Sequence, residues 1–148
     1  MDCRFTLCLP RDEASVPVVR HVCRDALHML GVADGCVAQI ELAVTEACTN
    51  VLRHVQGTDV EYEVSVSVNE RQCDIRLVDT AGQMFDHDAA GRVEANLDAE
   101  SGRGIFLMRA MVDELNFVSE SENGSVVHLI KRLELKEDAI LYRLVGSP

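Results

Sequence analysis

Two periods of hydrophobicity organise this chain, a period of two that is typical of strands and a longer one that is typical of helices. The shorter period is clearest at residues 60–68, VEYEVSVSV, where apolar or aromatic residues alternate strictly with polar ones. Residues 72–78, QCDIRLV, follow a turn at Asn69-Glu70-Arg71 and are the expected return strand. Together the two stretches predict an antiparallel hairpin with one buried face.

Further strands are expected near both ends of the chain. Residues 3–9, CRFTLCL, are short and apolar, and their place at the start predicts an edge strand that is available for dimerisation. Residues 115–119 and 125–133 flank Asn123-Gly124, which is a strong signal for a hairpin turn. These segments therefore predict a second antiparallel hairpin.

Two helices are predicted between the first strand and the first hairpin. One begins at Asp12 and ends near Leu30, because acidic residues suit a first helical turn and Gly31 is a common terminator. The residues of this helix that are expected to face the core are Val18, Val22, Ala26, Met29 and Leu30. Asp34 can cap the next helix, which includes residues 39–55. Its expected core-facing seam consists of Val37, Ile40, Val44, Ala47 and Val51.

Regular periodicity is lost between residues 80 and 101. A stretch of this length inside a compact domain is often a lid or a binding loop. It leads into SGRGIFLMRAMVDEL, where Gly102 and Gly104 are expected to come just before a helix. The apolar side of that helix would consist of Ile105, Met108, Val112 and Leu115. A glycine-rich backbone at a helix N-terminus offers N–H groups to an anion, although this signal is common and weak by itself.

The order of these elements predicts an α+β fold, a two-layer sandwich with a mostly antiparallel sheet and helices on one face. The 148 residues are expected to form a single domain. Its core would span about residues 3–133, and the tail at residues 134–148 would add a last strand or a short helix.

The composition is that of a folded aliphatic domain, because 47% of the residues are hydrophobic and only 4% are aromatic. No apolar run approaches the roughly 20 residues of a membrane span, and the N-terminus lacks the features of a secretory signal. The six cysteines form no C-x-x-C pair and show no zinc-binding spacing, which argues against a structural metal. Scattered cysteines in a chain without a secretory signal indicate a reducing cytoplasm. A net charge of −11 disfavours nucleic acid as a direct partner and favours a protein.

The second predicted helix carries a polar pair, Glu46 and Asn50, apart from its apolar seam. Both side chains point the same way because they are four residues apart, and they lie roughly 100–140° from the centre of the seam. Their neighbours on this side are Leu42 and Ala43, so the pair is expected to be partly enclosed. Taken alone, the pair is also compatible with an ordinary solvated helix face.

Four groups of residues together resemble the nucleotide-binding boxes of the GHKL (Bergerat-fold, histidine-kinase-like) ATPase superfamily. They are Glu46 with Asn50, Asp79 at a strand end, Gly102 with Gly104, and Gly124 with Ser125. Within that superfamily, ELAVTEACTNVLRH and GRGIFLMRAMVDEL resemble the anti-sigma-factor serine/threonine kinases of the RsbW type. The resemblance covers nearly the whole domain, and the boxes in this order are more specific than any one of them.

The resemblance implies a role for each box residue in binding ATP and Mg²⁺. Glu46 matches the general base, Asn50 the magnesium ligand, and Asp79 the carboxylate that binds the adenine amino group. The residues expected near the phosphates are Gly102, Arg103 and Gly104, with Arg53 as a further candidate. Ser125 stands where the family has threonine, near the adenine end.

The function implied by the resemblance is that of a kinase that binds a sigma factor and phosphorylates an anti-anti-sigma (STAS-domain) protein, as a cytoplasmic homodimer. Arg20 is the first candidate for contacting these partners and Arg24 the second, although both also fit a solvated basic ridge. The alternative is an ATPase-like regulatory binding module that switches protein partners with weak ATP binding and no phosphotransfer. It is favoured by Ala81, which occupies a glycine position of the adenine box unless Gly82 takes that place.

Overall fold

A computed structural model of the chain describes residues 1–54, 61–79, 100–120 and 124–146. The strands in these ranges are β1 (Cys3–Pro10), β2 (Glu61–Val68), β3 (Gln72–Asp79), β4 (Glu114–Glu120) and β5 (Gly124–Arg132). The helices are α1 (Ser15–Leu30), α2 (Asp34–His54), α4 (Glu100–Met111) and α5 (Leu141–Val145).

The described strands form one sheet in the order β1-β2-β3-β5-β4, and each neighbouring pair is antiparallel. Both predicted hairpins are therefore confirmed, and so is the position of β1 at a sheet edge. The register places Asp79 at the end of β3 opposite Tyr62 of β2 on one side and Ser125 of β5 on the other. This end of the central strands is where the base-binding residues were predicted.

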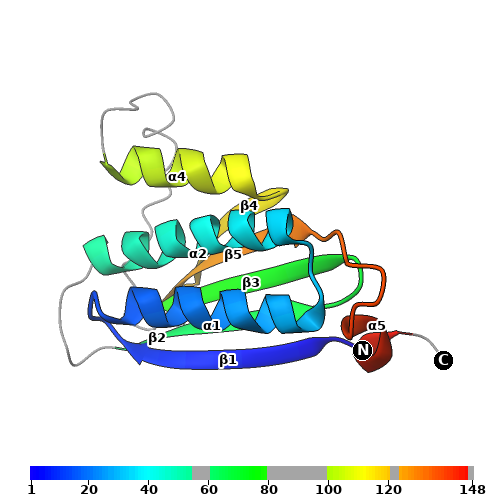
Figure 1. Cartoon of the computed structure of the whole chain (residues 1–148). Helices are drawn as coiled ribbons and strands as arrows, with labels where there is room; N and C mark the ends of the chain where they lie inside the picture. Colours follow the sequence, from blue (N-terminus) through cyan, green and yellow to red (C-terminus); the bar gives the residue numbers. More distant parts are fainter. Residues whose placement is uncertain (55–60, 80–99, 121–123, 147–148) are drawn as a thin grey trace.

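The helices α1, α2 and α4 lie side by side over one face of the sheet, with α2 in the middle (Figure 1). The predicted seam of α2 is confirmed, since all five of its apolar residues are buried. They meet the buried alternate residues of β2 and β3, which include Val64, Val66 and Ile75. Burying each such side chain contributes roughly 1.5–3 kcal/mol, so this seam fixes the orientation of α2 and of its polar pair.

The prediction for α1 is wrong in two respects. The helix begins at Ser15, because Asp12 belongs to the preceding turn, where its Oδ1 accepts a 2.8 Å hydrogen bond from the Ala14 N–H. Its buried residues are Ser15, Val19, Cys23 and Leu27, whereas Val18 is 45% exposed and Met29 is 79% exposed. Helix α1 carries apolar residues on more than one side, so spacing alone allows two seams. Packing against α2 and the sheet selects the seam that runs from Ser15 through Val19 and Cys23 to Leu27.

The start of α4 also differs from the prediction. The helix begins at Glu100, so Gly102 and Gly104 lie inside it, and Leu115 belongs to β4. Glycine in a helix costs about 1 kcal/mol relative to alanine, which is why a sequence pattern places the boundary after the glycines. The contact between α4 and α2 offsets the cost of placing glycine in a helix. This contact requires a residue without a side chain at Gly104, because Glu46 approaches closely there.

The C-terminal tail packs against the turn between α1 and α2, and it ends in the short helix α5. Gly31 has a φ of 88°, and a Cβ at this position would lie 2.4 Å from the Cβ of Ala139. The Lys136 N–H donates a 2.8 Å hydrogen bond to the Gly31 carbonyl, and Leu141 is fully buried. The tail therefore depends on the glycine that ends α1.

Candidate functional site

Asn50 lies in the last turns of α2 and is only 5% exposed. Its Oδ1 atom is buried and has no hydrogen-bond partner among the described residues. Leaving a buried polar atom unpaired costs roughly 1–3 kcal/mol, so such an atom in a folded protein requires an explanation. An amide oxygen is a ligand that Mg²⁺ accepts, and an ion at this position would satisfy the atom.

Glu46 lies one turn before Asn50 and is half-buried, in agreement with the predicted partial enclosure. On that side Ala43 is buried, whereas Leu42 is 37% exposed. The Oε2 atom of Glu46 lies 3.0 Å from the place that a Cβ on Gly104 would occupy. The fold thus brings together two predicted site residues that are far apart in the sequence, and it does so across the contact between α2 and α4.

The N-terminus of α4 lies next to that contact, because Gly104 is the fifth residue of the helix. Gly102 is buried and Arg103 is exposed. The first four N–H groups of an α-helix have no acceptor within the helix, and this set includes the N–H of Gly102. The N–H of Gly104, the fifth residue of α4, falls outside the set. The first glycine therefore suits an anion, while the second allows the Glu46 carboxylate to approach closely.

Asp79 ends β3, and its side chain is fully buried together with that of Arg11. The two side chains form an ion pair between the guanidinium Nη2 and the carboxylate Oδ1. Burial lowers the pKa of Arg11. Sequence reasoning missed Arg11, because an arginine after a strand is common and only the order β1-β2-β3 brings it to the end of β3.

Tyr62 joins the same end of the sheet to the start of α1. Its hydroxyl forms a 2.5 Å hydrogen bond with the hydroxyl of Ser15, which donates a 2.7 Å hydrogen bond to the Asp12 carbonyl. Burial raises the pKa of Tyr62, so the phenol stays neutral and can donate. This chain of hydrogen bonds fixes the turn that carries Arg11.

The remaining predicted residues are only partly placed. Arg53 is exposed near the end of α2, and the backbone of Ser125 lies opposite Asp79. Ala81 and Gly82 lie outside the described residues. Arg20 and Arg24 lie near the same acidic residue of α2, Glu41, at 3.8 and 4.0 Å.

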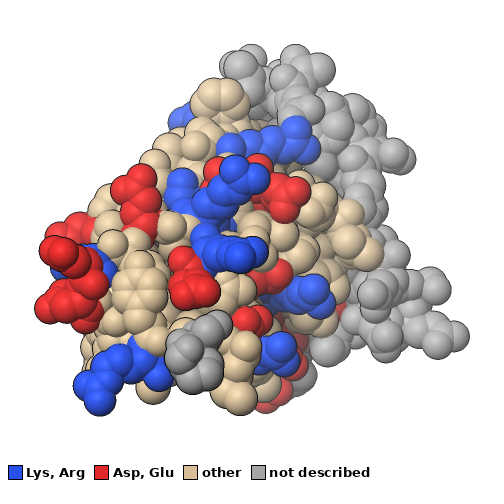
Figure 2. Space-filling view, turned by 90° about the vertical axis from the view of Figure 1, so that its right-hand side faces the viewer, with Lys and Arg blue, Asp and Glu red and all other residues tan. Residues whose placement is uncertain are grey.

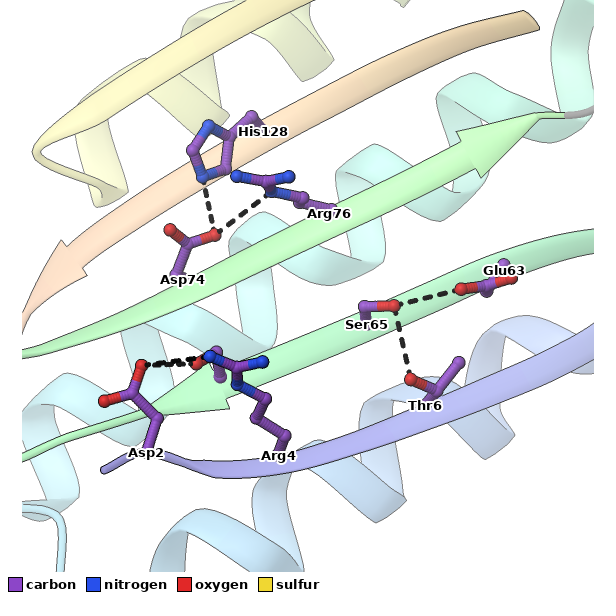
Figure 3. Close-up of polar contacts among 9 residues, drawn as sticks. Asp2, Arg4, Thr6, Glu63, Ser65, Asp74, Arg76 and His128 are labelled. Atoms are coloured by element: carbon purple, nitrogen blue, oxygen red, sulfur yellow. Dashed lines mark hydrogen bonds and ion pairs between the residues drawn. The ribbon is translucent and has the colours of Figure 1, made fainter. Parts of the chain in front are cut away.

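The helix-free face of the sheet carries a separate set of polar contacts (Figure 3). Asp74 of β3 lies 2.5 Å from His128 of β5 and 3.7 Å from Arg76. Thr6 of β1 and Ser65 of β2 share a 3.3 Å hydrogen bond. The contacts of His128 with Asp74 and of Thr6 with Ser65 join neighbouring strands and stabilise the sheet, and they lie on the face away from Asn50 and Asp79.

The end of the molecule near α5 carries charges of both signs (Figure 2). Lys136 lies 3.1 Å from Asp34, and the backbone N–H of Arg132 donates a 2.6 Å hydrogen bond to Asp113. The basic pair formed by Lys131 and Arg132 is therefore flanked by acidic groups. It does not form a uniformly positive surface of the kind that binds a phosphate backbone.

The α+β sandwich thus carries a buried amide oxygen on α2 and a buried carboxylate at the end of a central strand. The chain belongs to the family of histidine kinase-like ATPase domains, whose family model matches residues 9–131. Within this class it is similar to the serine-protein kinase RsbW of Halalkalibacterium halodurans. The two are 29% identical over 137 residues, which cover 87% of this chain and 83% of that protein.

Two further comparisons agree with this assignment. The serine-protein kinase RsbW of Bacillus velezensis is 27% identical over 135 residues, which cover 84% of this chain and 82% of that protein. The solved structure of the RsbU and RsbW domains of Rv1364c from Mycobacterium tuberculosis matches 88% of this chain with a TM-score of 0.66. This chain spans 32% of that longer one, and at 19% identity the likeness shows the fold alone. None of the described helices is long and apolar enough to cross a membrane.

Proposed function

We propose that the protein is an ATP- and Mg²⁺-dependent serine/threonine kinase that acts as an anti-sigma factor. The observation that carries the proposal is the buried Oδ1 of Asn50, which has no hydrogen-bond partner in the described part of the chain and lies one turn from a carboxylate that contacts α4. The membership of the histidine kinase-like ATPase family and the similarity to RsbW kinases support it. RsbW proteins are named as serine-protein kinases, so the proposed phosphate acceptor is a side-chain hydroxyl of a protein substrate.

Asn50 would hold Mg²⁺ through its amide oxygen, and the nucleotide phosphates and water would supply the other ligands. The observation that fits such an ion is the buried amide oxygen, which lacks a hydrogen-bond partner among the described residues. When bound, the ion supplies positive charge against the phosphates. The N-terminus of α4 adds the N–H of Gly102, and Asp79 would accept a hydrogen bond from the adenine amino group.

Glu46 is proposed as the general base. Its carboxylate would accept the proton of a serine hydroxyl on the protein substrate while that oxygen attacks the γ-phosphorus of ATP. The new P–O bond replaces the bond to the β-phosphate oxygen, and ADP leaves. In-line transfers of this kind depend mainly on positioning and charge neutralisation, which are the contributions of α2 and α4.

The partners proposed for the kinase are a sigma factor and an anti-anti-sigma protein of the STAS type. Arg20 and Arg24, with Glu41, form a charged cluster across α1 and α2 that would contact them. A homodimer would pair through the exposed edge of β1, and the protein would act in the cytoplasm. No direct contact with nucleic acid or with a membrane is part of the proposal.

Phosphotransfer can be tested with Mg-ATP and a candidate anti-anti-sigma protein. Phosphoserine or phosphothreonine on that protein is expected with the natural chain and not with Glu46→Ala. Glu70→Gln, in the exposed turn between β2 and β3, is a matched control that should transfer normally. Lack of transfer by the natural chain at saturating nucleotide would exclude the kinase function.

The second candidate function is a binding module that switches partners without phosphotransfer. The specific observation in its favour is the ion pair between Arg11 and Asp79, because the carboxylate proposed to bind adenine already has a ligand. Ala81, at a glycine position of the adenine box, also favours this second function. If labelled ATP fails to bind while the candidate partner still binds, this function replaces the first one.

A further inference from the structure

Arg11 is an unusual residue for the place that it occupies. It is 4% exposed, and its Nε and Nη1 atoms have no hydrogen-bond partner among the described residues. Arginine is almost never buried unless it is paired, and the pair in this case is with Asp79. Within the described residues, the guanidinium is therefore paired with one carboxylate, that of Asp79.

Hydrogen bonds on both sides of Arg11 hold the backbone of its turn. Pro10 precedes it, and the Asp12 N–H donates a 2.9 Å hydrogen bond to the Pro10 carbonyl across Arg11. Ser15 anchors the following residues through its hydrogen bonds to Asp12 and Tyr62. Because this turn is tied to both β2 and α1, the Arg11 side chain must rotate about its own bonds in order to leave Asp79.

Two donors compete for the Asp79 carboxylate if the proposed function is correct, and this inference rests on that condition. The adenine amino group is a neutral donor, whereas the guanidinium is charged and its hydrogen bonds are roughly twice as strong. Both need the same buried oxygens at the end of β3. An adenine nucleotide must therefore offset the loss of an ion pair that already exists.

We propose that Arg11 is an internal ligand of the base-recognition carboxylate, and that an adenine nucleotide must displace it to bind. Arg11 then lowers the affinity for ATP and weakens the preference for adenine over bases without a 6-amino group. Inosine triphosphate is such a nucleotide, because it presents a carbonyl oxygen at that position. The carbonyl can accept a hydrogen bond from Arg11 while the ion pair persists, whereas it would be repelled by an unpaired carboxylate.

The experiment measures the binding of Mg-ATP and Mg-ITP by calorimetry to the full chain and to variants. Arg11→Met removes the charge with similar length, and Arg11→Lys keeps it. Asp79→Asn, alone and combined with Arg11→Met, tests whether the effect passes through the carboxylate. Arg76→Met is the matched control, because this exposed arginine lies on the same strand but on the opposite face.

We expect Arg11→Met to bind ATP about tenfold more tightly than the natural chain, and its ratio of ATP to ITP affinity to rise by at least as much. Arg11→Lys and Arg76→Met should stay close to the natural chain. In the Asp79→Asn background, Arg11→Met should change neither value. A purely structural role for Arg11 would lower the unfolding temperature without changing the ATP to ITP ratio.

The inference is overturned if folded Arg11→Met binds ATP no more tightly than a natural chain that itself binds ATP. The proposed function would survive that result. If neither protein binds any nucleotide, the proposed function fails and the inference fails with it. Should Arg11→Met not fold, Arg11→Gln takes its place, because it keeps hydrogen-bonding groups without charge, and the same outcomes decide.

Discussion

The two ends of the candidate site differ in whether the oxygen proposed to bind the ligand already has a partner within the described part of the chain. At the phosphate end, Asn50 leaves a buried oxygen without a partner among the described residues, and Glu46 faces a glycine. At the base end, Asp79 is paired with Arg11, and Tyr62 and Ser15 satisfy one another. One end is therefore prepared for a ligand, whereas the other is closed by the protein itself. Under the proposed function, the base end would govern the affinity for the nucleotide and the phosphate end the transfer chemistry.

The largest effect is expected from breaking the ion pair on one side only. Asp79→Ala leaves the Arg11 charge buried and unpaired, which should lower the free energy of unfolding by about 3–5 kcal/mol. Replacing both partners with uncharged residues, as in Arg11→Met with Asp79→Asn, should restore most of that loss. Urea unfolding measures both variants. Equal stability of Asp79→Ala and the natural chain would mean that the pair does not close the base end.

Asn50→Ala is expected to act on function and not on folding. Phosphotransfer should fall by about 100-fold or more, because the proposed metal ligand is lost. The free energy of unfolding should stay the same or rise by about 1 kcal/mol, since an unpaired buried oxygen is removed. Thr49→Ala on the same helix turn is the control. A large loss of stability in Asn50→Ala would show that the amide serves the core.

Gly104→Ala tests the close approach between the two helices at the phosphate end. The new Cβ would lie 3.0 Å from Oε2 of Glu46, so the carboxylate must shift by a few tenths of an ångström. Transfer is expected to fall about tenfold, because a small misplacement of the base reduces its reach to the substrate hydroxyl. ATP affinity, measured in parallel, should change much less. A transfer rate equal to that of the natural chain would contradict the role of this contact.

The smallest effect concerns pH and a thiol near the base end. Burial raises the pKa of Cys48 from 9.0 to about 12. In the unfolded chain the thiol ionises near its ordinary pKa while the folded chain keeps it neutral. This contribution to stability is therefore full below pH 9 and is lost progressively as the pH rises through the folded pKa. Cys48→Ala should reduce the fall in stability between pH 8 and 10 by about 1 kcal/mol, as measured by urea unfolding. If stability falls between pH 8 and 10 by the same amount in Cys48→Ala, another group is responsible for that loss.

Much of the fold follows from local patterns that admit one solution. Alternation at residues 60–68 and 72–78 predicts the central hairpin, and the seam of α2 has no competing apolar stripe of equal length. On α1 the pattern predicts the helix but not its buried face, because Val18 and Val19 both fit an apolar stripe. The start of α4 is likewise set by packing against α2, which outweighs the low helix propensity of Gly102 and Gly104.

The sequence by itself determined the elements, their order, and the spacing that sets Glu46 and Asn50 on one side of a helix. The periodicity of apolar residues and the four-residue spacing of Glu46 and Asn50 carry this information, because both patterns relate residues that are close in the sequence. Only the tertiary structure decided that Glu46 meets Gly104, that the Asn50 oxygen is buried without a partner in the described ranges, and that Arg11 reaches Asp79. These contacts join segments that lie far apart in the sequence. They depend on strand order and helix packing, which no local pattern records.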